Sequence, residues 1–345
     1  MACVSSVRIE PDDSKAMSSN SQVITAPDET PIRAIAPART TFGAYVQLSK
    51  ARLNAMVVVT TAVGYLLAAP RPLPWMTLLW TCLGVFLAAI GASAFNQAFE
   101  AKRDARMQRT HTRPVPSGRI SLAAAITFGL LASIIGVAII CPTSTPLAAV
   151  LTILNILFYA LVYTPMKPMS SANTLVGAVV GALPPMIGWA AATGTLDAGA
   201  LLLGGILFVW QIPHFLALAW LYREDYARGG YKMLSNTEPT GRASGLMAIT
   251  YALALIPLSL ALVYRGHAGI IFGATSIVLG AWLVWMAMRF AATKTKAAAR
   301  ALFLCSVIYL PMLLCVLVCD MRQPLSLLTQ HRPAEQVPFV DPAQQ

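Results

Sequence analysis

Three oxygen-bearing side chains, Asn96, Glu100 and Asp104, recur at intervals of four residues where one apolar stretch ends. A step of four residues advances about 40° around an α-helix, so the three side chains share one face. Carboxylate and amide oxygens suit Mg²⁺, which commonly keeps substrate phosphates and waters among its ligands. The row therefore predicts a magnesium site. The alternative is a solvated helix end, with Glu100 paired to Arg103 or Asp104 to Lys102.

A basic loop follows this row directly. It runs from Arg106 to Arg119 and contains Arg109, His111 and Arg113 among hydroxyl-bearing and turn residues. Arginine can hold a phosphate or carboxylate through two parallel hydrogen bonds. Carboxylates beside such a loop suit a metal with a diphosphate, the metal on the carboxylates and the remaining oxygens on the arginines. The alternative is that these charges only flank a membrane helix.

A second polar group lies near the end of another apolar stretch. His214 and Asp225 are eleven residues apart and would lie within about 20° of each other on a helix. Pro213 should free a backbone carbonyl further up that helix. This placement favours a site, although a buried histidine is often only a hydrogen-bonded helix contact. Lys167, after a further apolar stretch, supplies another cation or anchors the helix at the interface.

The composition indicates where these groups must be positioned. Of 345 residues, 57% are apolar and 11% are charged, whereas a soluble globular chain has about 25% charged residues. This deficit argues against a soluble enzyme with one ordinary core. The six cysteines show no C-x-x-C spacing, which argues against a disulfide framework or a zinc site.

Nine apolar stretches are long enough to cross a bilayer as helices. Their approximate spans are 53–69, 76–99, 120–140, 146–166, 172–192, 200–221, 244–264, 268–288 and 301–319. The predicted fold is therefore an all-α polytopic membrane protein with nine transmembrane helices, formed by residues 42–320. Residues 1–41 are predicted to be a disordered cytoplasmic tail and residues 321–345 a polar C-terminal tail.

The basic residues alternate between the two sides of these spans. One side carries 21 lysines and arginines and the other carries 4. Basic residues gather in cytoplasmic loops, so the N-terminus is predicted to be cytoplasmic and the C-terminus to be on the outer face. The net charge of +11 then reflects topology and not a nucleic-acid partner.

Several motifs together resemble the UbiA-type intramembrane prenyltransferases. The row and its loop look like the first aspartate-rich motif of that family. The segments Tyr163–Lys167, Pro184–Gly194 and Trp210–Gly230 are most similar to its haem-modifying branch, the protoheme IX farnesyltransferases or haem O synthases. The resemblance covers roughly residues 42–320.

The resemblance implies nine helices around a central cavity open to lipid. It implies transfer of farnesyl from farnesyl diphosphate to a vinyl group of haem B, with addition of water, giving haem O for haem-copper oxidases. The implied cofactor is Mg²⁺, as two ions, and haem B is a substrate. The implied partners are the lipid bilayer and the downstream haem A synthase, and the implied location is a bacterial inner membrane.

The resemblance also implies roles for individual residues. Catalytic or metal-binding roles fall to Asn96, Glu100, Asp104, Asp225, Glu224 and His214. Binding of diphosphate or haem falls to Arg103, Arg109, Arg113, Lys167, Arg228, Lys232, His111, Tyr222, Tyr226 and Trp210. In these roles aromatic faces stabilise the allylic cation, and His214 or His111 contacts the haem.

The second motif departs from the family pattern. Many members have Asp-x-x-x-Asp there, whereas Gly229 follows Asp225 by four residues and Leu221 precedes it by four. The second metal arm is then Asp225 with Glu224, or Asp225 alone. Three other functions stay open: prenylation of an aromatic acid or quinone precursor, secondary transport, and a structural role in oxidase assembly.

Overall fold

A computed structural model describes residues 41–322, and its regular elements are helices. They are α1 Thr41–Leu48, α2 Ala51–Ala68, α3 Trp75–Asp104, α4 Leu122–Thr143, α5 Pro146–Leu157, the π-helical η1 Phe158–Tyr163, α6 Thr164–Met166, α7 Asn173–Thr193, α8 Ala198–Leu221, α9 Arg223–Arg228, α10 Leu234–Thr237, α11 Arg242–Tyr264, α12 Ile270–Thr293 and α13 Lys296–Cys319. The tails predicted at 1–41 and 321–345 lie outside the described residues, except for positions 41, 321 and 322.

Nine helical segments within residues 41–322 are long and apolar enough to cross a membrane, which confirms the predicted number. α5, η1 and α6 together make one of them, Pro146–Met166. The largest differences are in length. α3 continues to Asp104 where the prediction ended at 99, and α13 begins at Lys296 where the prediction began at 301. The longer α3 carries the whole predicted polar row on one uninterrupted helix.

Hydroxyl and carboxylate caps begin several of these helices. Side-chain oxygens of Ser121, Thr145, Asp197 and Thr295 accept hydrogen bonds from backbone N–H groups of the first turns of α4, α5, α8 and α13. Such caps satisfy donors that have no partner inside the helix. α7 continues as one helix through Pro184 and Pro185.

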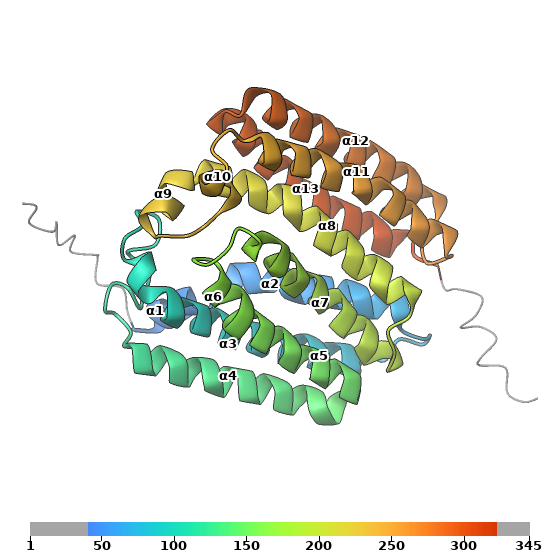
Figure 1. Cartoon of the computed structure of the whole chain (residues 1–345). Coiled ribbons are helices and arrows are strands. Elements are labelled where there is room, and N and C mark those ends of the chain that lie inside the picture. The colour runs from blue at the N-terminus through green and yellow to red at the C-terminus, as the bar shows by residue number, and fades with distance from the viewer. Residues whose placement is uncertain (1–40, 323–345) are drawn as a thin grey trace, which may run out of the picture. The chain divides into compact units, whose positions relative to one another are not determined.

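Packing of the helices brings the last span back to the first. α3 packs on α4, α2 on α7, α7 on α8, and α8 on both α11 and α13, while α13 also contacts α2. Figure 1 shows α11, α12 and α13 together on one side of α8. The largest apolar core joins α8 to these three helices.

The loops predicted on the basic side lie at one end of the bundle. Figure 1 shows α1, α6, α9 and α10 at that end, on the left of the view. Hydrogen bonds connect its segments: the Lys232 N–H donates to the Lys167 carbonyl, and Trp220 Nε1 donates to the Lys294 carbonyl. The chemistry-bearing residues of the sequence therefore gather at this end, which we call the basic end.

Candidate active site

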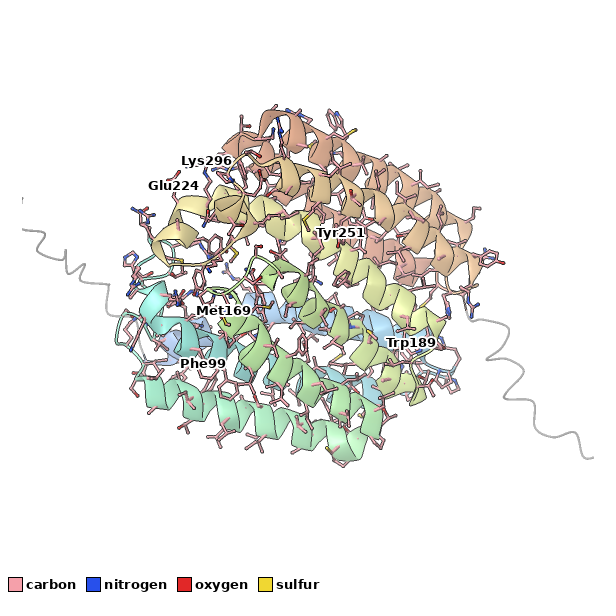
Figure 2. The ribbon with its side chains drawn as sticks, viewed as in Figure 1. Phe99, Met169, Trp189, Glu224, Tyr251 and Lys296 are labelled. Carbon is pink, nitrogen blue, oxygen red and sulfur yellow. The ribbon has the colours of Figure 1, made fainter. Side chains whose placement is uncertain are left out.

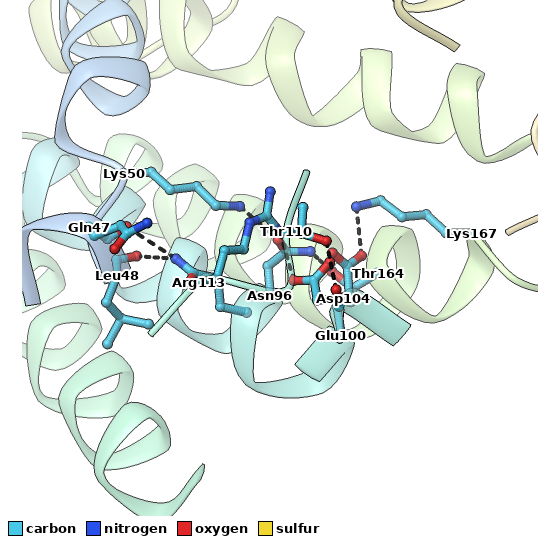
Figure 3. A network of polar contacts seen from close by, with 11 residues as sticks. Gln47, Leu48, Lys50, Asn96, Glu100, Asp104, Thr110, Arg113, Thr164 and Lys167 are labelled. Carbon is cyan, nitrogen blue, oxygen red and sulfur yellow. Dashed lines mark hydrogen bonds and ion pairs between the residues drawn. The ribbon is translucent and has the colours of Figure 1, made fainter. Parts of the chain in front are cut away.

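The predicted polar row forms a buried face at the end of α3. Asn96, Glu100 and Asp104 are 1%, 5% and 0% exposed, and Figure 3 shows them close together. The alternative of a solvated helix end is wrong, because all three side chains are withdrawn from solvent. Arg103 donates to the carbonyls of Gly229 and Gly230 at 3.2 Å.

Basic side chains from distant segments meet the first two members of the row. Lys50 Nζ, between α1 and α2, donates to Asn96 Oδ1 at 2.8 Å. Lys167 Nζ, just after α6, donates to Glu100 Oε1 at 2.6 Å. The row thus faces two basic side chains, as a site for an anionic ligand and its metal would.

Lys50 was not identified from the sequence. Its backbone lies in the left-handed region (φ 47°, ψ 42°), which a lysine rarely adopts. Burial, with the nearby Arg113 charge, lowers the pKa of Lys50 to about 7, although Glu100 acts in the opposite direction. In the sequence, Lys50 stands out only because it directly precedes an apolar span. A basic residue at that place is also expected from the cytoplasmic side of a membrane helix.

Lys167 differs from Lys50 in its electrostatics. Burial disfavours its charge, but Glu100 and neighbouring tyrosines outweigh that effect and hold the pKa of Lys167 well above its usual value. Its ammonium also lies 4.6 Å from the centre of the Tyr163 ring. Lys167 is therefore a permanent positive charge beside the row.

Asp104 has one engaged oxygen and one unpartnered oxygen. Its Oδ2 accepts from Arg113 at 2.7 Å, and its backbone carbonyl accepts from Thr110 Oγ1 at 2.9 Å. Its buried Oδ1 has no hydrogen-bond partner among the described residues. Because an orphaned buried oxygen is costly, this atom fits a ligand for a cation.

The donor set on α3 suits Mg²⁺ with a substrate. No group of three or more His, Cys, Asp or Glu side chains in residues 41–322 could hold a metal by itself. Mg²⁺, however, is usually bound by one or two carboxylates and substrate phosphates. Glu100 and Asp104, with the Asn96 amide, therefore match the ion only in combination with a phosphate ligand.

Asp225 on α9 fastens the basic loop to the second motif. Its Oδ1 accepts from the Gln108 N–H at 2.9 Å and from Arg228 at 2.6 Å, and its Oδ2 accepts from the Arg109 N–H at 3.1 Å. Burial would raise the pKa of Asp225, but these hydrogen bonds outweigh it and the pKa lies below its usual value. The two motifs thus meet through the loop, and both oxygens of Asp225 are engaged.

Glu224 lies away from the row. It is exposed and pairs with Lys296 of α13 at 2.8 Å, as Figure 2 shows at the edge of the bundle. Consecutive residues of a helix point about 100° apart. The side chains of Glu224 and Asp225 therefore do not converge. Asp225 with Glu224 as a joint metal arm is therefore not what this geometry provides.

Other predicted residues line the outside of the loop. The Arg109 guanidinium lies 5.0 Å and 5.8 Å from the ring centres of Tyr222 and Tyr226. His111 is exposed and its Nδ1 contacts the Gln108 carbonyl, and Lys232 is also exposed. These side chains surround the basic end and do not line the cavity described next.

A cavity of about 650 Å³ lies between α2, α3, α5, η1, α7, α8 and α13, and it is partly open at the surface, where the exposed Leu53 and Met56 line it. We call it the chamber. Its walls are mainly apolar, and its charged, polar and aromatic lining residues are Arg52, Asn54, Thr60, Ser93, Thr152, Asn155, Tyr159, Tyr163, Trp210, Gln211, His214 and Phe215. Tyr163 both lines the chamber and contacts Lys167. Tyr163 therefore connects the wall of the chamber to Lys167, one of the cations that face the row.

The contrast between Asp225 and Glu224 gives a direct prediction. Asp225→Asn weakens hydrogen bonds to a charged acceptor, each worth about 1.5–3 kcal/mol, so the loop opens more often. Trypsin should then cleave after Arg109, which Thr110 follows, at least about tenfold faster. Glu224→Gln should leave that rate unchanged, and equal cleavage of both variants would show that Asp225 does not hold the loop.

The sequence and the fold both have close counterparts. The UbiA prenyltransferase family model matches residues 57–308. The human mitochondrial protoheme IX farnesyltransferase is 44% identical over 279 residues, which are 80% of this chain and 62% of that protein. The protoheme IX farnesyltransferase of Salinibacter ruber is 41% identical over 276 residues, 80% of this chain and 98% of that protein.

Two solved structures show the same fold at low identity. A digeranylgeranylglyceryl phosphate synthase structure gives a TM-score of 0.69 at 16% identity, covering 81% of this chain and 98% of that one. A UbiA homologue from Archaeoglobus fulgidus, bound to GPP and Mg²⁺, gives 0.56 at 9% identity, covering 79% and 99%. Since the family model matches most of the chain and the fold agrees, the chain belongs to the UbiA prenyltransferase family.

Proposed function

We propose that this chain transfers the farnesyl group of farnesyl diphosphate to a vinyl group of haem B, with addition of water, to give haem O and diphosphate. The names and identities of its relatives support the substrates. The observation that carries the reaction type is the buried row on α3 facing Lys50, Lys167 and Arg113 beside an apolar chamber. Diphosphate binds at the charged end, and the isoprenoid and porphyrin occupy the chamber.

Asn96, Glu100 and Asp104 would hold Mg²⁺ in this proposal, with Asp104 Oδ1 as the unpartnered ligand atom. When bound, the metal neutralises negative charge that develops on the leaving diphosphate. The Archaeoglobus homologue bound to GPP and Mg²⁺ supports this chemistry. A second ion on Asp225 stays a prediction, and it would require that carboxylate to give up a loop contact.

The chain's cations would hold the diphosphate and stabilise it as the allylic C–O bond breaks. Lys167 and Arg113 come from different segments and converge on the row, so their geometry is fixed before the substrate binds. Arg109 and Arg228 lie at the loop and would receive the outer oxygens. Arg103 is tied to the Gly229 and Gly230 carbonyls and would position the loop beside them.

The chamber would protect the allylic cation from premature capture by water. Its mainly apolar walls disfavour water, and the faces of Tyr159, Tyr163 and Trp210 offer cation–π stabilisation. The resemblance implied Trp210, Tyr222 or Tyr226 for that role, and of these Trp210 lines the chamber, whereas the rings of Tyr222 and Tyr226 lie against Arg109. Tyr159 and Tyr163 of the π-helical η1 line the chamber and are placed to stabilise the cation.

The membrane setting follows the same proposal. The nine spans make the chain an integral membrane protein. We propose that the basic end is cytoplasmic, because 21 of 25 basic residues fall on that side by sequence. We also propose that the membrane is a bacterial inner membrane, which the similarity to the Salinibacter ruber protein supports. Delivery of the product to a haem A synthase stays a prediction.

A defined conversion tests this function. Membranes containing the protein, supplied with Mg²⁺, haem B and labelled farnesyl diphosphate, should yield a labelled haem that is more hydrophobic by chromatography and heavier by mass spectrometry. 4-Hydroxybenzoate in place of haem B should give no labelled product. Label on 4-hydroxybenzoate alone would support the quinone-precursor alternative, and cation flux without any product would support a transporter.

A further inference from the structure

His214 is the histidine that lines the chamber. It lies on α8, and its ring sits between aromatic neighbours, with centroids 5.2 Å from Trp210 and 4.8 Å from Phe303 of α13. His111 is exposed on the basic loop, and His267 is buried next to Trp189, which Figure 2 shows far from the basic end. Of the three histidines in residues 41–322, His214 is therefore the one that a substrate in the chamber can reach.

A buried serine determines which nitrogen of His214 carries the proton. Ser306 of α13 is 0% exposed, and its Oγ lies 2.9 Å from His214 Nδ1. The same Oγ lies 2.6 Å from the carbonyl oxygen of Phe303. A carbonyl has no hydrogen, so the single hydroxyl proton must lie in that short contact. Ser306 Oγ can then only accept from His214, which makes His214 the Nδ1–H tautomer.

This tautomer leaves an unshared electron pair on Nε2. No described residue makes a hydrogen bond to Nε2, and the ring is held on both sides by aromatic contacts. Ser306 also accepts from Trp210 Nε1 through its carbonyl at 2.9 Å. One residue of α13 thus fixes two adjacent chamber side chains of α8.

We propose that Ser306 positions His214 so that its Nε2 binds the iron of the haem substrate as an axial ligand. A histidine that binds a metal typically donates its other ring N–H to a neighbouring acceptor, which fixes its orientation and its basicity. The contact with Ser306 has that form. Neutral imidazole is a common ligand of haem iron, and the flat aromatic neighbours suit a porphyrin face. This inference rests on the proposed function, because it takes haem as the substrate.

Binding of two porphyrins to the purified full-length protein tests the inference without turnover. Ferric haem B should bind at least about tenfold more tightly than metal-free protoporphyrin IX and should show the absorption spectrum of a histidine-ligated haem. His214→Ala should lose both the preference and that spectrum, while metal-free protoporphyrin IX still binds. Added imidazole should restore the spectrum of haem that stays bound to the protein, and the retained binding of metal-free protoporphyrin IX shows that the variant is folded.

Ser306→Ala tests the positioning role against a matched control. Loss of a residue that orients a metal ligand typically costs about 10–100-fold in metal affinity, so we expect at least tenfold weaker haem B binding with unchanged binding of metal-free protoporphyrin IX. Ser276 on α12 is equally buried and makes the same type of bond to a carbonyl three residues earlier, at 2.8 Å. Ser276→Ala should leave both affinities unchanged.

The outcomes separate the inference from the proposed function. A wild-type protein that binds haem B and whose spectrum persists in His214→Ala overturns axial ligation and leaves the prenyl transfer intact. Equal losses in Ser306→Ala and Ser276→Ala overturn the positioning role. A wild-type protein that binds neither porphyrin overturns both the inference and haem as the substrate.

Discussion

Asp104→Asn should reduce the turnover number for prenyl transfer by about a hundredfold to a thousandfold. The substitution keeps the shape of the side chain, and the amide oxygen can still accept from Arg113. It removes a negative charge from the row and halves the oxygen ligands that Asp104 offers. A metal ion contributes several kcal/mol of charge stabilisation, and each 1.4 kcal/mol is about a factor of ten in rate.

Turnover measured against Mg²⁺ concentration distinguishes a metal role from general damage. Asp104→Asn should require at least about tenfold more Mg²⁺ for half-maximal rate. Asp197→Asn is the control, since Asp197 caps α8 through the Gly199 and Ala200 N–H groups and lies outside the row, and asparagine caps helices equally well. Undiminished turnover in Asp104→Asn, or an equal loss in Asp197→Asn, would contradict the metal site on α3.

Gly188→Ala should destabilise the protein by more than about 3 kcal/mol, a cost in the upper part of the range for single substitutions. A methyl group on Gly188 of α7 would fall on the carbonyl oxygen of Thr61 of α2, far inside van der Waals contact. Backbone atoms cannot rotate aside, so α2 and α7 would have to separate. Both helices line the chamber, and the variant should therefore lose folded protein and substrate binding together.

Thermal unfolding in detergent, followed by circular dichroism, measures this effect. Gly205→Ala in α8 is the matched control, because the nearest atom to an added methyl there is Leu258 Cδ2 at 3.9 Å. Alanine is a better helix former than glycine by about 1 kcal/mol, so the control should be neutral or slightly stabilising. Similar melting temperatures for the two variants would mean that α2 and α7 can separate without cost.

The local regularities were available from the sequence. A spacing of four residues placed Asn96, Glu100 and Asp104 on one face because helix geometry is the same in every context, and their burial agrees with a site. The number of spans followed from apolar length alone. The distribution of basic residues indicated which loops share an end, and the hydrogen bonds between those loops agree with it.

Tertiary structure decided which groups face one another. Lys50 reached Asn96 across 46 residues and Ser306 reached His214 across 92, and no periodicity within one helix encodes such pairs. Glu224 forms an ion pair with Lys296, whereas Asp225 accepts hydrogen bonds from the loop, although both residues are acidic and adjacent in sequence. Which residues share a helical face depends on local backbone geometry, so it can be read from their spacing in the sequence. The partner of each face depends on how distant helices pack, and side-chain shape and burial across the whole bundle determine that packing.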